Sequence, residues 1–139
     1  MRIAILFAAG VLALFSFWLP AYADTTSQNS LSDLTARLLE TRSCIGCNLQ
    51  DADLSGQDLR GVNLSRANLQ NASLNKANLM AAYLRDANLQ GTDLRQADLL
   101  AIDLSGANLK DAKLSRVTLD TARLCDTIAP NGKLSRRDC

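Results

Sequence analysis

The sequence predicts an all-β solenoid, a fold in which short extended segments stack into a column of coils. A leucine occupies every fifth position from Leu49 to Leu124 without a break. The residue two places before most of these leucines is small or apolar, as in Ala52 and Val62, and the residue between the two is mostly polar. An internal repeat this regular over residues 47–126 indicates a repeat architecture.

The five-residue period excludes the two ordinary secondary structures. On an α-helix, residues five apart are rotated by about 140°, so the leucines would face every direction. A long strand also fails, because side chains alternate with period two and an odd spacing sends successive leucines to opposite faces. A corner must therefore follow each leucine, and residues such as Gly56, Asn71 and Gly91 suit turns at that point. Stacked coils would bury the leucines and pair the main chain with the coils above and below.

The repeated units resemble those of a known family. Ala-Asn-Leu-Gln at residues 67–70, Ala-Asp-Leu-Leu at 97–100 and Ala-Asn-Leu-Lys at 107–110 are typical of pentapeptide-repeat proteins. This resemblance covers residues 47–126 without a gap and implies a right-handed quadrilateral β-helix. With four units per turn, the sixteen units would form about four coils. At a strand spacing of about 4.8 Å the body would be about 20 Å long.

Residues 1–23 are typical of an export signal. Arg2 supplies a positive charge, residues 3–19 form an uncharged apolar run, and Ala-Tyr-Ala at 21–23 fits a cleavage site. The mature chain is then expected to begin at Asp24, in the periplasm or the thylakoid lumen. An uncleaved membrane anchor is the alternative, because the apolar run approaches the length of about 20 residues that a spanning helix needs.

The charge balance limits the partners. The chain holds 15 basic and 14 acidic residues, and loss of Arg2 with the signal would leave 14 of each. A formally neutral protein has little long-range attraction for nucleic acid or for an acidic membrane surface. We therefore expect no nucleic-acid partner, and membrane contact only through an uncleaved signal.

A short helix over about residues 31–42 is expected within the N-terminal lead, residues 24–46. Ser30 and Asp33 have the spacing of a capping box. Four leucines fall on one helical face, namely Leu31, Leu34, Leu38 and Leu39. Because the first coil of a solenoid exposes unpaired main chain, the helix is expected to cap it. Recruitment of a partner by this helix is the alternative.

Four cysteines in an exported chain indicate disulfides. Cys47 and Cys125 are 78 residues apart, nearly four coils. Their separation along the stack would be close to 20 Å, whereas a disulfide requires Cα atoms within about 7 Å. We therefore expect Cys44 to pair with Cys47 and Cys125 with Cys139. The second bond would tie down a C-terminal cap, residues 127–139, and contribute about 3 kcal/mol in the chain-entropy model.

The Cys44-Ile-Gly-Cys47 segment permits other chemistry. A thiol-redox-responsive regulator using Cys44 and Cys47 is an alternative function. A thioredoxin-like site needs a βαβ setting, which this pattern lacks. A zinc site needs four ligands, and the chain has no histidine. We expect no metal and no cofactor. The early Cys-x-x-Cys, the leading helix and the cysteine-bearing tail with its Pro-x-Gly turn resemble exported family members from photosynthetic bacteria and the chloroplast lumen.

Two surface features follow from stacking positions twenty apart. Met80 and Leu100 point outward, bordered by Ala81 and Ala101, with Tyr83 around the corner. Such an apolar cluster can mark a contact site, so it is our candidate protein-contact surface, with an ordinary scatter of exposed apolar residues as the alternative. A second face stacks four asparagines that are expected to bond along a ladder, which are Asn48, Asn68, Asn88 and Asn108.

The inner positions include two polar residues, Gln57 and Thr92. We expect their side chains to find main-chain partners, because a buried polar group without a partner is unfavourable.

No nucleophile with a general base can be assembled from the pattern, because the chain lacks histidine and leucine and alanine fill the interior. We expect no surface pocket, no enzyme and no small-molecule substrate. The predicted function is a non-catalytic structural or protein-interaction module in an extracytoplasmic compartment, with an unknown protein partner. The family resemblance also implies a less favoured alternative, mimicry of duplex DNA to bind type II topoisomerases. Mimicry needs a long acidic rod, whereas residues 47–126 hold ten acidic and nine basic side chains.

We predict that the exported protein begins at Asp24, because signal peptidase recognises small residues before its cleavage site. Intact-mass measurement of protein from the extracytoplasmic fraction checks this. A membrane-bound protein that keeps residues 1–23 would instead support the anchor.

Overall fold

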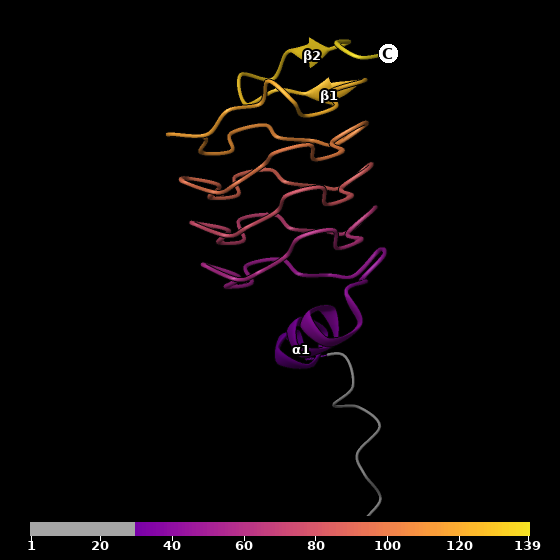
Figure 1. The fold of residues 1–139 in the computed structure, drawn as a ribbon, viewed down its shortest axis with the longest axis vertical. Coiled ribbons are helices and arrows are strands. Elements are labelled where there is room, and N and C mark those ends of the chain that lie inside the picture. Colours follow the sequence, from indigo (N-terminus) through magenta and orange to yellow (C-terminus); the bar gives the residue numbers. More distant parts are fainter. Residues whose placement is uncertain (1–29) are drawn as a thin grey trace, which may run out of the picture.

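The structure is a computed structural model that describes residues 30–139. The expected export signal, residues 1–23, lies outside the described residues. Helix α1 (Leu31–Thr41) is followed by stacked coils, and strands β1 (Thr127–Ile128) and β2 (Leu134–Ser135) end the chain. Figure 1 shows α1 at one end of the stack and the C-terminus at the other. Within residues 30–139, none of the helical structure has the length and apolar character of a membrane span.

Helix α1 begins as the capping pattern predicts. The backbone N–H of Asp33 donates to the Ser30 hydroxyl at 3.2 Å. The helix ends one residue earlier than expected, because Arg42 takes a left-handed conformation (φ 58°) and donates its N–H to the Leu38 carbonyl at 2.9 Å. Leu34 and Leu38 are buried in the same core as the coils.

The coils are joined by a main-chain ladder between residues twenty positions apart. Parallel bridges run from Ser43 with Asn63 to Asn108 with Ile128. In the regular part, a leucine N–H donates to the next coil, as from Leu64 to the Tyr83 carbonyl at 2.8 Å. A twenty-residue turn built from five-residue units has four sides, as the quadrilateral expectation requires.

The corners depend on a left-handed backbone at the second residue after most leucines. Non-glycine residues adopt it at Asp51, Asn71 and Ala81, with φ between 54° and 58°. This conformation is uncommon outside glycine. A Cβ at Gly106 would meet the Asp86 carboxylate of the coil below, so a larger residue there would also require the Asp86 side chain to move.

Thr121 occupies a corner position without a positive φ. The side chain is β-branched, and such residues strongly disfavour the left-handed region. The ladder is interrupted beside it, since no bridge joins Asp98 to Thr118 within the described residues. The Ala101 N–H donates to the Thr121 hydroxyl at 3.0 Å instead of to a main-chain carbonyl. The last coil therefore departs from the regular stack on this side.

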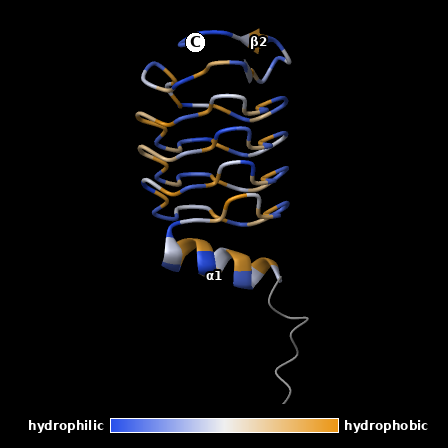
Figure 2. Cartoon of the chain, turned by 90° about the vertical axis from the view of Figure 1, so that its right-hand side faces the viewer, coloured by the Kyte–Doolittle hydropathy of each residue, from blue (hydrophilic) through white to orange (hydrophobic). Residues whose placement is uncertain are grey.

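The interior is filled by leucines and small residues. The periodic leucines from Leu49 to Leu124 are buried except Leu114 and Leu119, which pack against the core with part of their surface exposed. Figure 2 shows the apolar and polar positions recurring from coil to coil.

The predicted asparagine ladder forms over Asn48, Asn68 and Asn88, while no side-chain bond joins Asn108 to Asn88 in the described residues, and Thr92 finds the expected main-chain partner. The Asn68 amide donates to Asn48, and the Asn88 amide donates to Asn68, both at 3.1 Å. The buried Thr92 hydroxyl donates to the Leu69 carbonyl at 2.8 Å. The expectation for Gln57 is wrong, because its side chain is exposed and has no hydrogen-bond partner among residues 30–139. The nearby end of the stack leaves it in water.

The main-chain ladder continues into the segment expected to be only a cap. Leu109 donates to the Ile128 carbonyl at 2.8 Å and Asp111 to the Pro130 carbonyl at 3.0 Å. The chain then turns, and β2 pairs antiparallel with β1. In Figure 1 this tail runs over only part of the last coil.

We predict that Leu84→Asp abolishes the cooperative thermal transition. Leu84 is fully buried in mid-stack. Removing such a side chain costs about 2–5 kcal/mol, and an unpaired buried carboxylate adds a further penalty. Circular dichroism melts check this, with the outward Gln90→Asp as the control that should melt near the wild type. An unaltered melt of the Leu84 variant would contradict the inward assignment.

Candidate functional site

Both predicted disulfides are present. Cys44 and Cys47 have Cα atoms 5.4 Å apart, and Cys125 and Cys139 have Cα atoms 4.7 Å apart. The first pair lies inside the protein, with Cys44 1% and Cys47 8% exposed. The Arg37 guanidinium from α1 lies 3.7 Å from the Cys47 sulfur. This pair therefore fastens the junction between α1 and the first coil.

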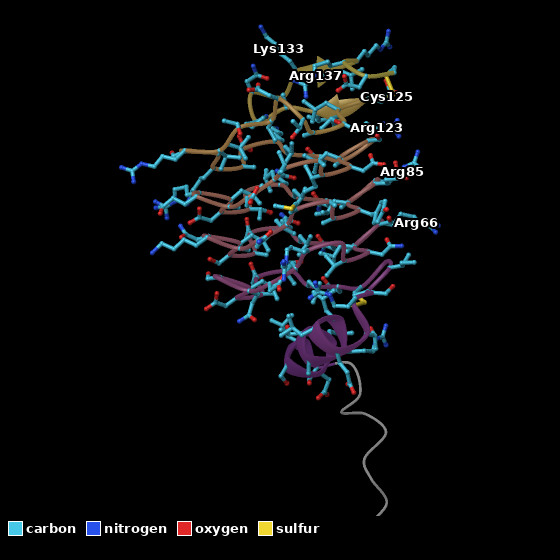
Figure 3. All side chains as sticks on the ribbon, in the orientation of Figure 1. Arg66, Arg85, Arg123, Cys125, Lys133 and Arg137 are labelled. Atoms are coloured by element: carbon cyan, nitrogen blue, oxygen red, sulfur yellow. A yellow bond between two sulfur atoms is a disulfide. The ribbon has the colours of Figure 1, made fainter. Side chains whose placement is uncertain are left out.

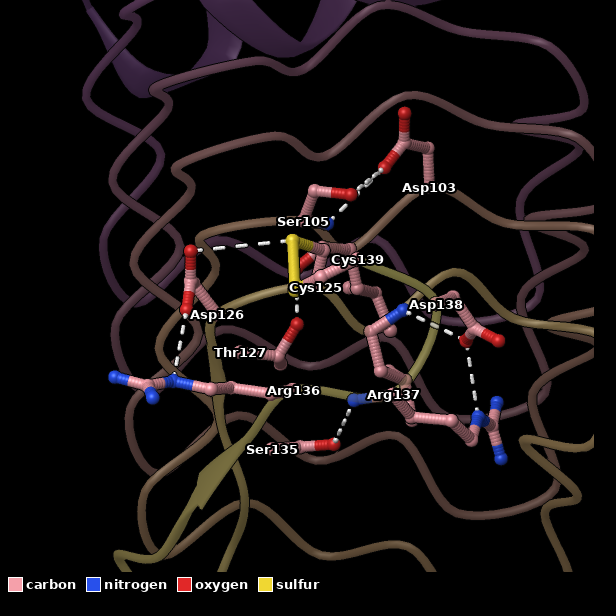
Figure 4. The surroundings of a disulfide bond; sticks show 12 residues. Asp103, Ser105, Cys125, Asp126, Thr127, Ser135, Arg136, Arg137, Asp138 and Cys139 are labelled. Atoms are coloured by element: carbon pink, nitrogen blue, oxygen red, sulfur yellow. Dashed lines mark hydrogen bonds and ion pairs between the residues drawn. A yellow bond between two sulfur atoms is a disulfide. The ribbon is translucent and has the colours of Figure 1, made fainter.

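The second disulfide has the opposite setting. Cys139 is exposed and Cys125 is half-buried. Figure 4 shows the bond beside Asp126, whose carboxylate lies 3.9 Å from the Cys125 sulfur and 3.6 Å from the Arg136 guanidinium. Of the two bonds, the C-terminal one is the accessible one.

The same neighbourhood holds the one cluster within residues 30–139 whose atoms are close enough for a metal ion. Cys125, Asp126 and Cys139 bring their ligand atoms within 4.8 Å of one another. Both sulfurs are joined in the disulfide, and thiolates rather than disulfide sulfurs bind metals. The oxidised protein therefore offers only one carboxylate here.

The predicted contact residues come together on one side and corner of the stack. Tyr83 is 52% and Leu100 48% exposed, Ala81 and Ala101 are exposed, and Met80 is half-buried. The Ala81 N–H donates to the Leu100 carbonyl at 2.8 Å, which fixes the two coils in register. These five residues, called the contact strip below, form an apolar surface on a hydrogen-bonded backbone.

The expected absence of a surface pocket is wrong. A shallow cavity of about 490 Å³ lies along another corner of the stack. Small residues at successive corners leave the space, and Figure 3 shows Arg66, Arg85 and Cys125 following the same edge. Its walls include Ser65, Arg66, Arg85, Asp86, Ser105 and Cys125. Sequence reasoning missed it because the cavity depends on how long and short side chains alternate along the stack.

The cavity does not hold an activated nucleophile. The Ser105 hydroxyl donates to the Asp103 carboxylate at 2.6 Å. Burial raises the pKa of Asp103, but the hydrogen bonds from Ser105 and the nearby Arg85 guanidinium together place it below the ordinary value. A carboxylate with a lowered pKa is a weak base at neutral pH, so it does not activate the serine.

Ion pairs hold several surface carboxylates in the charged form. The side-chain hydrogen bond from Arg95, 2.6 Å from the carboxylate, lowers the pKa of Asp93 to about 2. The hydrogen bond from Arg60 likewise lowers the pKa of Asp58. These paired charges leave the sides of the stack close to neutral.

Five-residue units, a twenty-residue turn and a filled interior define a β-solenoid repeat protein. The family model for pentapeptide repeats (8 copies) matches residues 47–86, 63–99, 82–120 and 102–136. The chain belongs to the pentapeptide-repeat family, whose fold is a right-handed quadrilateral β-helix. No curated protein matches the sequence significantly.

Two solved structures are similar over most of the described residues. HetL, a pentapeptide-repeat protein of Nostoc sp. strain PCC 7120 involved in heterocyst differentiation regulation, is 37% identical over 67% of this chain, with a TM-score of 0.55. A pentapeptide-repeat protein from the Arabidopsis thaliana thylakoid lumen is 34% identical over 61% of this chain, with a TM-score of 0.59. This chain covers 40% of the first structure and 59% of the second.

We predict that mild reductant opens the Cys125–Cys139 bond at least about tenfold faster than the Cys44–Cys47 bond, because thiol–disulfide exchange requires access to a sulfur. Timed dithiothreitol treatment, alkylation and peptide mapping check this. In guanidinium chloride, where the fold no longer shields either bond, the two rates should converge. Equal rates in the native protein would contradict the assigned difference in access.

Proposed function

We propose that this protein is a non-catalytic structural or protein-interaction module of an extracytoplasmic compartment, the periplasm or the thylakoid lumen. The contact strip carries the proposal. Tyr83 and Leu100 are about half exposed on a surface of otherwise mostly polar and charged side chains. Their backbone is held by the ladder, so a partner binds them without first ordering the chain, and this lowers the entropic cost of association.

The architecture that supports this role is a stack of about four coils with a cap at each end. Leu34 and Leu38 of α1 are buried against the first coil. Arg42 then donates to two carbonyls that face this end, those of Asp58 and Arg60, both at 2.6 Å. Guanidinium groups suit this task because they present several donors in a fixed plane.

The tail makes the corresponding contacts at the other end. Arg137 donates to the Ala122 carbonyl at 2.6 Å, and the Asp138 carboxylate accepts from the Leu124 N–H at 3.3 Å. The disulfide between Cys125 and Cys139 ties these two residues to the stack.

Three observations support an extracytoplasmic location. The sequence begins with a segment typical of an export signal. All four cysteines are paired, as in proteins of oxidising compartments. The similar Arabidopsis protein comes from the thylakoid lumen.

The two alternative functions have less support. Regulation through Cys44 and Cys47 would need reductant to reach a pair that the fold buries. Duplex mimicry would need strong negative charge, and residues 47–126 are close to neutral.

We predict that Met80→Glu with Leu100→Glu abolishes partner association and leaves the melting temperature within a few degrees of the wild type. Both side chains point outward, so the charges remain hydrated. Crosslinking mass spectrometry on the extracytoplasmic fraction measures the association.

Gln70→Glu with Gln90→Glu is the matched control. These residues occupy the equivalent outward positions, also twenty apart, on another side of the stack. The control should keep the wild-type crosslinks. Equal crosslinking by wild type, control and the Met80 variant would refute the contact strip as the binding surface.

A further inference from the structure

The C-terminal end of the stack is open on two of its four sides. In the coils below, the periodic leucine N–H groups donate to the next coil, with Leu99 as the exception. In the last coil, the N–H groups of Leu114, Arg116 and Leu119 have no hydrogen-bond partner among residues 30–139. The carbonyls of Ala112 and Val117, which would accept from a following coil, also lack one. The Leu119 carbonyl of the same stretch accepts from the Arg137 guanidinium of the tail. We call residues 112–121 the open edge.

The turn at residues 130–132 explains why this edge has no coil above it. Leu134 falls on the leucine period and would begin the next side of a continuing solenoid. The turn reverses the chain instead, so that β2 pairs with β1 and Leu134 is 53% exposed. In Figure 1 the tail lies over one part of the last coil and leaves the other part uncovered.

Apolar surface accompanies the unpaired main chain. Leu114, Val117 and Leu119 are only partly buried, although the corresponding residues one coil below, such as Leu94 and Leu99, are almost fully buried. A row of unpaired N–H and C=O groups beside apolar side chains is a template for an added strand.

Lys113 and Arg116 place two cations on the first side of the open edge and its corner, and Lys133 of the tail is a third. All three are exposed and make no ion pair within the described residues. The carboxylates of this region are Asp111, directly before the edge, and Asp120, near its far end. A segment that carries acidic side chains on its outer face would therefore be attracted to this edge.

We propose that residues 112–121 dock an extended acidic segment of a partner protein as an added strand. This inference rests on the proposed interaction function and names the chemical class of the partner. The segment would place apolar residues over Leu114 and Leu119, and an outward acidic residue over Lys113 and beside Arg116. Its outward residues donate their N–H groups to the carbonyls of Ala112 and Val117, as outward residues do throughout the ladder.

A second copy of this chain is a poorer occupant. A two-fold axis through the corner of the open edge would bring Arg116 next to its own copy. Like charges at an interface oppose association. An acidic segment from another protein meets no such opposition.

The test uses the mature protein with both disulfides and a labelled peptide of the sequence Val-Glu-Leu-Ser-Gly-Val-Glu-Leu. This peptide repeats the inward, outward, inward order of two units with a glycine corner. We expect saturable binding by fluorescence anisotropy, and slower amide hydrogen exchange at Leu114, Arg116 and Leu119 by at least about tenfold. A peptide with lysine in place of glutamate should not bind. N-methylation of the peptide's backbone at its two glutamates should also abolish binding, because it removes the amide N–H groups that would enter the ladder.

Lys113→Glu with Arg116→Glu should weaken binding by about tenfold or more, as expected for reversing two rim charges. Lys76→Glu, which lies at the same corner two coils below, should bind the peptide as the wild type does. Binding that survives nitrogen methylation, or protection away from the open edge, would overturn the proposal. A further outcome would also overturn it: slower amide exchange at the open edge without peptide, increasing with protein concentration while size-exclusion chromatography shows a dimer. A second copy of the chain would then be the occupant.

The outcomes separate this inference from the proposed function. Suppose that the peptide does not bind, but the wild type forms partner crosslinks that the Met80 and Leu100 variant loses. The open-edge proposal then fails and the interaction function stands. If peptide binding follows the expected pattern while those crosslinks are unaffected by the double substitution, the contact strip fails and the open edge stands.

Discussion

The main-chain ladder between residues twenty apart is the constraint on which the rest of this structure depends. Each bond is worth only about 0.5–1.5 kcal/mol net, but every coil repeats the set, and the buried leucines exclude water from it. The ladder also requires a corner in every five residues, which explains the left-handed backbone at Asp51, Asn71 and Ala81. Where Thr121 does not take that conformation, the pairing of the last coil is lost on that side.

A ladder of this kind satisfies its own main chain everywhere except at its ends, so the ends need separate solutions. At the N-terminal end, α1 covers the leucines, and the Arg42 guanidinium donates hydrogen bonds to two carbonyls of the first coil. At the C-terminal end, Arg137 and Asp138 satisfy one region, and residues 112–121 remain without a covering strand. The long sides serve as rigid surfaces, and the contact strip is the apolar part of one of them.

Much of the fold could be predicted because its causes are local. The Ser30 cap, the inward leucines, the Thr92 hydrogen bond and both disulfide pairings follow from spacing alone once coils are stacked. The exposure of Gln57, the corner cavity and the break beside Thr121 could not be predicted in the same way. Each depends on which residues lie above and below in neighbouring coils and on where the stack ends.

The sequence by itself determined the five-residue period, the inner and outer faces and the set of cysteines able to meet, because each is set by residues close together in the chain or by a fixed rise per coil. Only the tertiary structure decided which disulfide is accessible and which end of the ladder stays open. Both depend on the path of the tail after the turn at 130–132, where Leu134 continues the leucine period but the chain does not continue the coil. The reversed path places Cys139 at the surface and leaves residues 112–121 without a following coil.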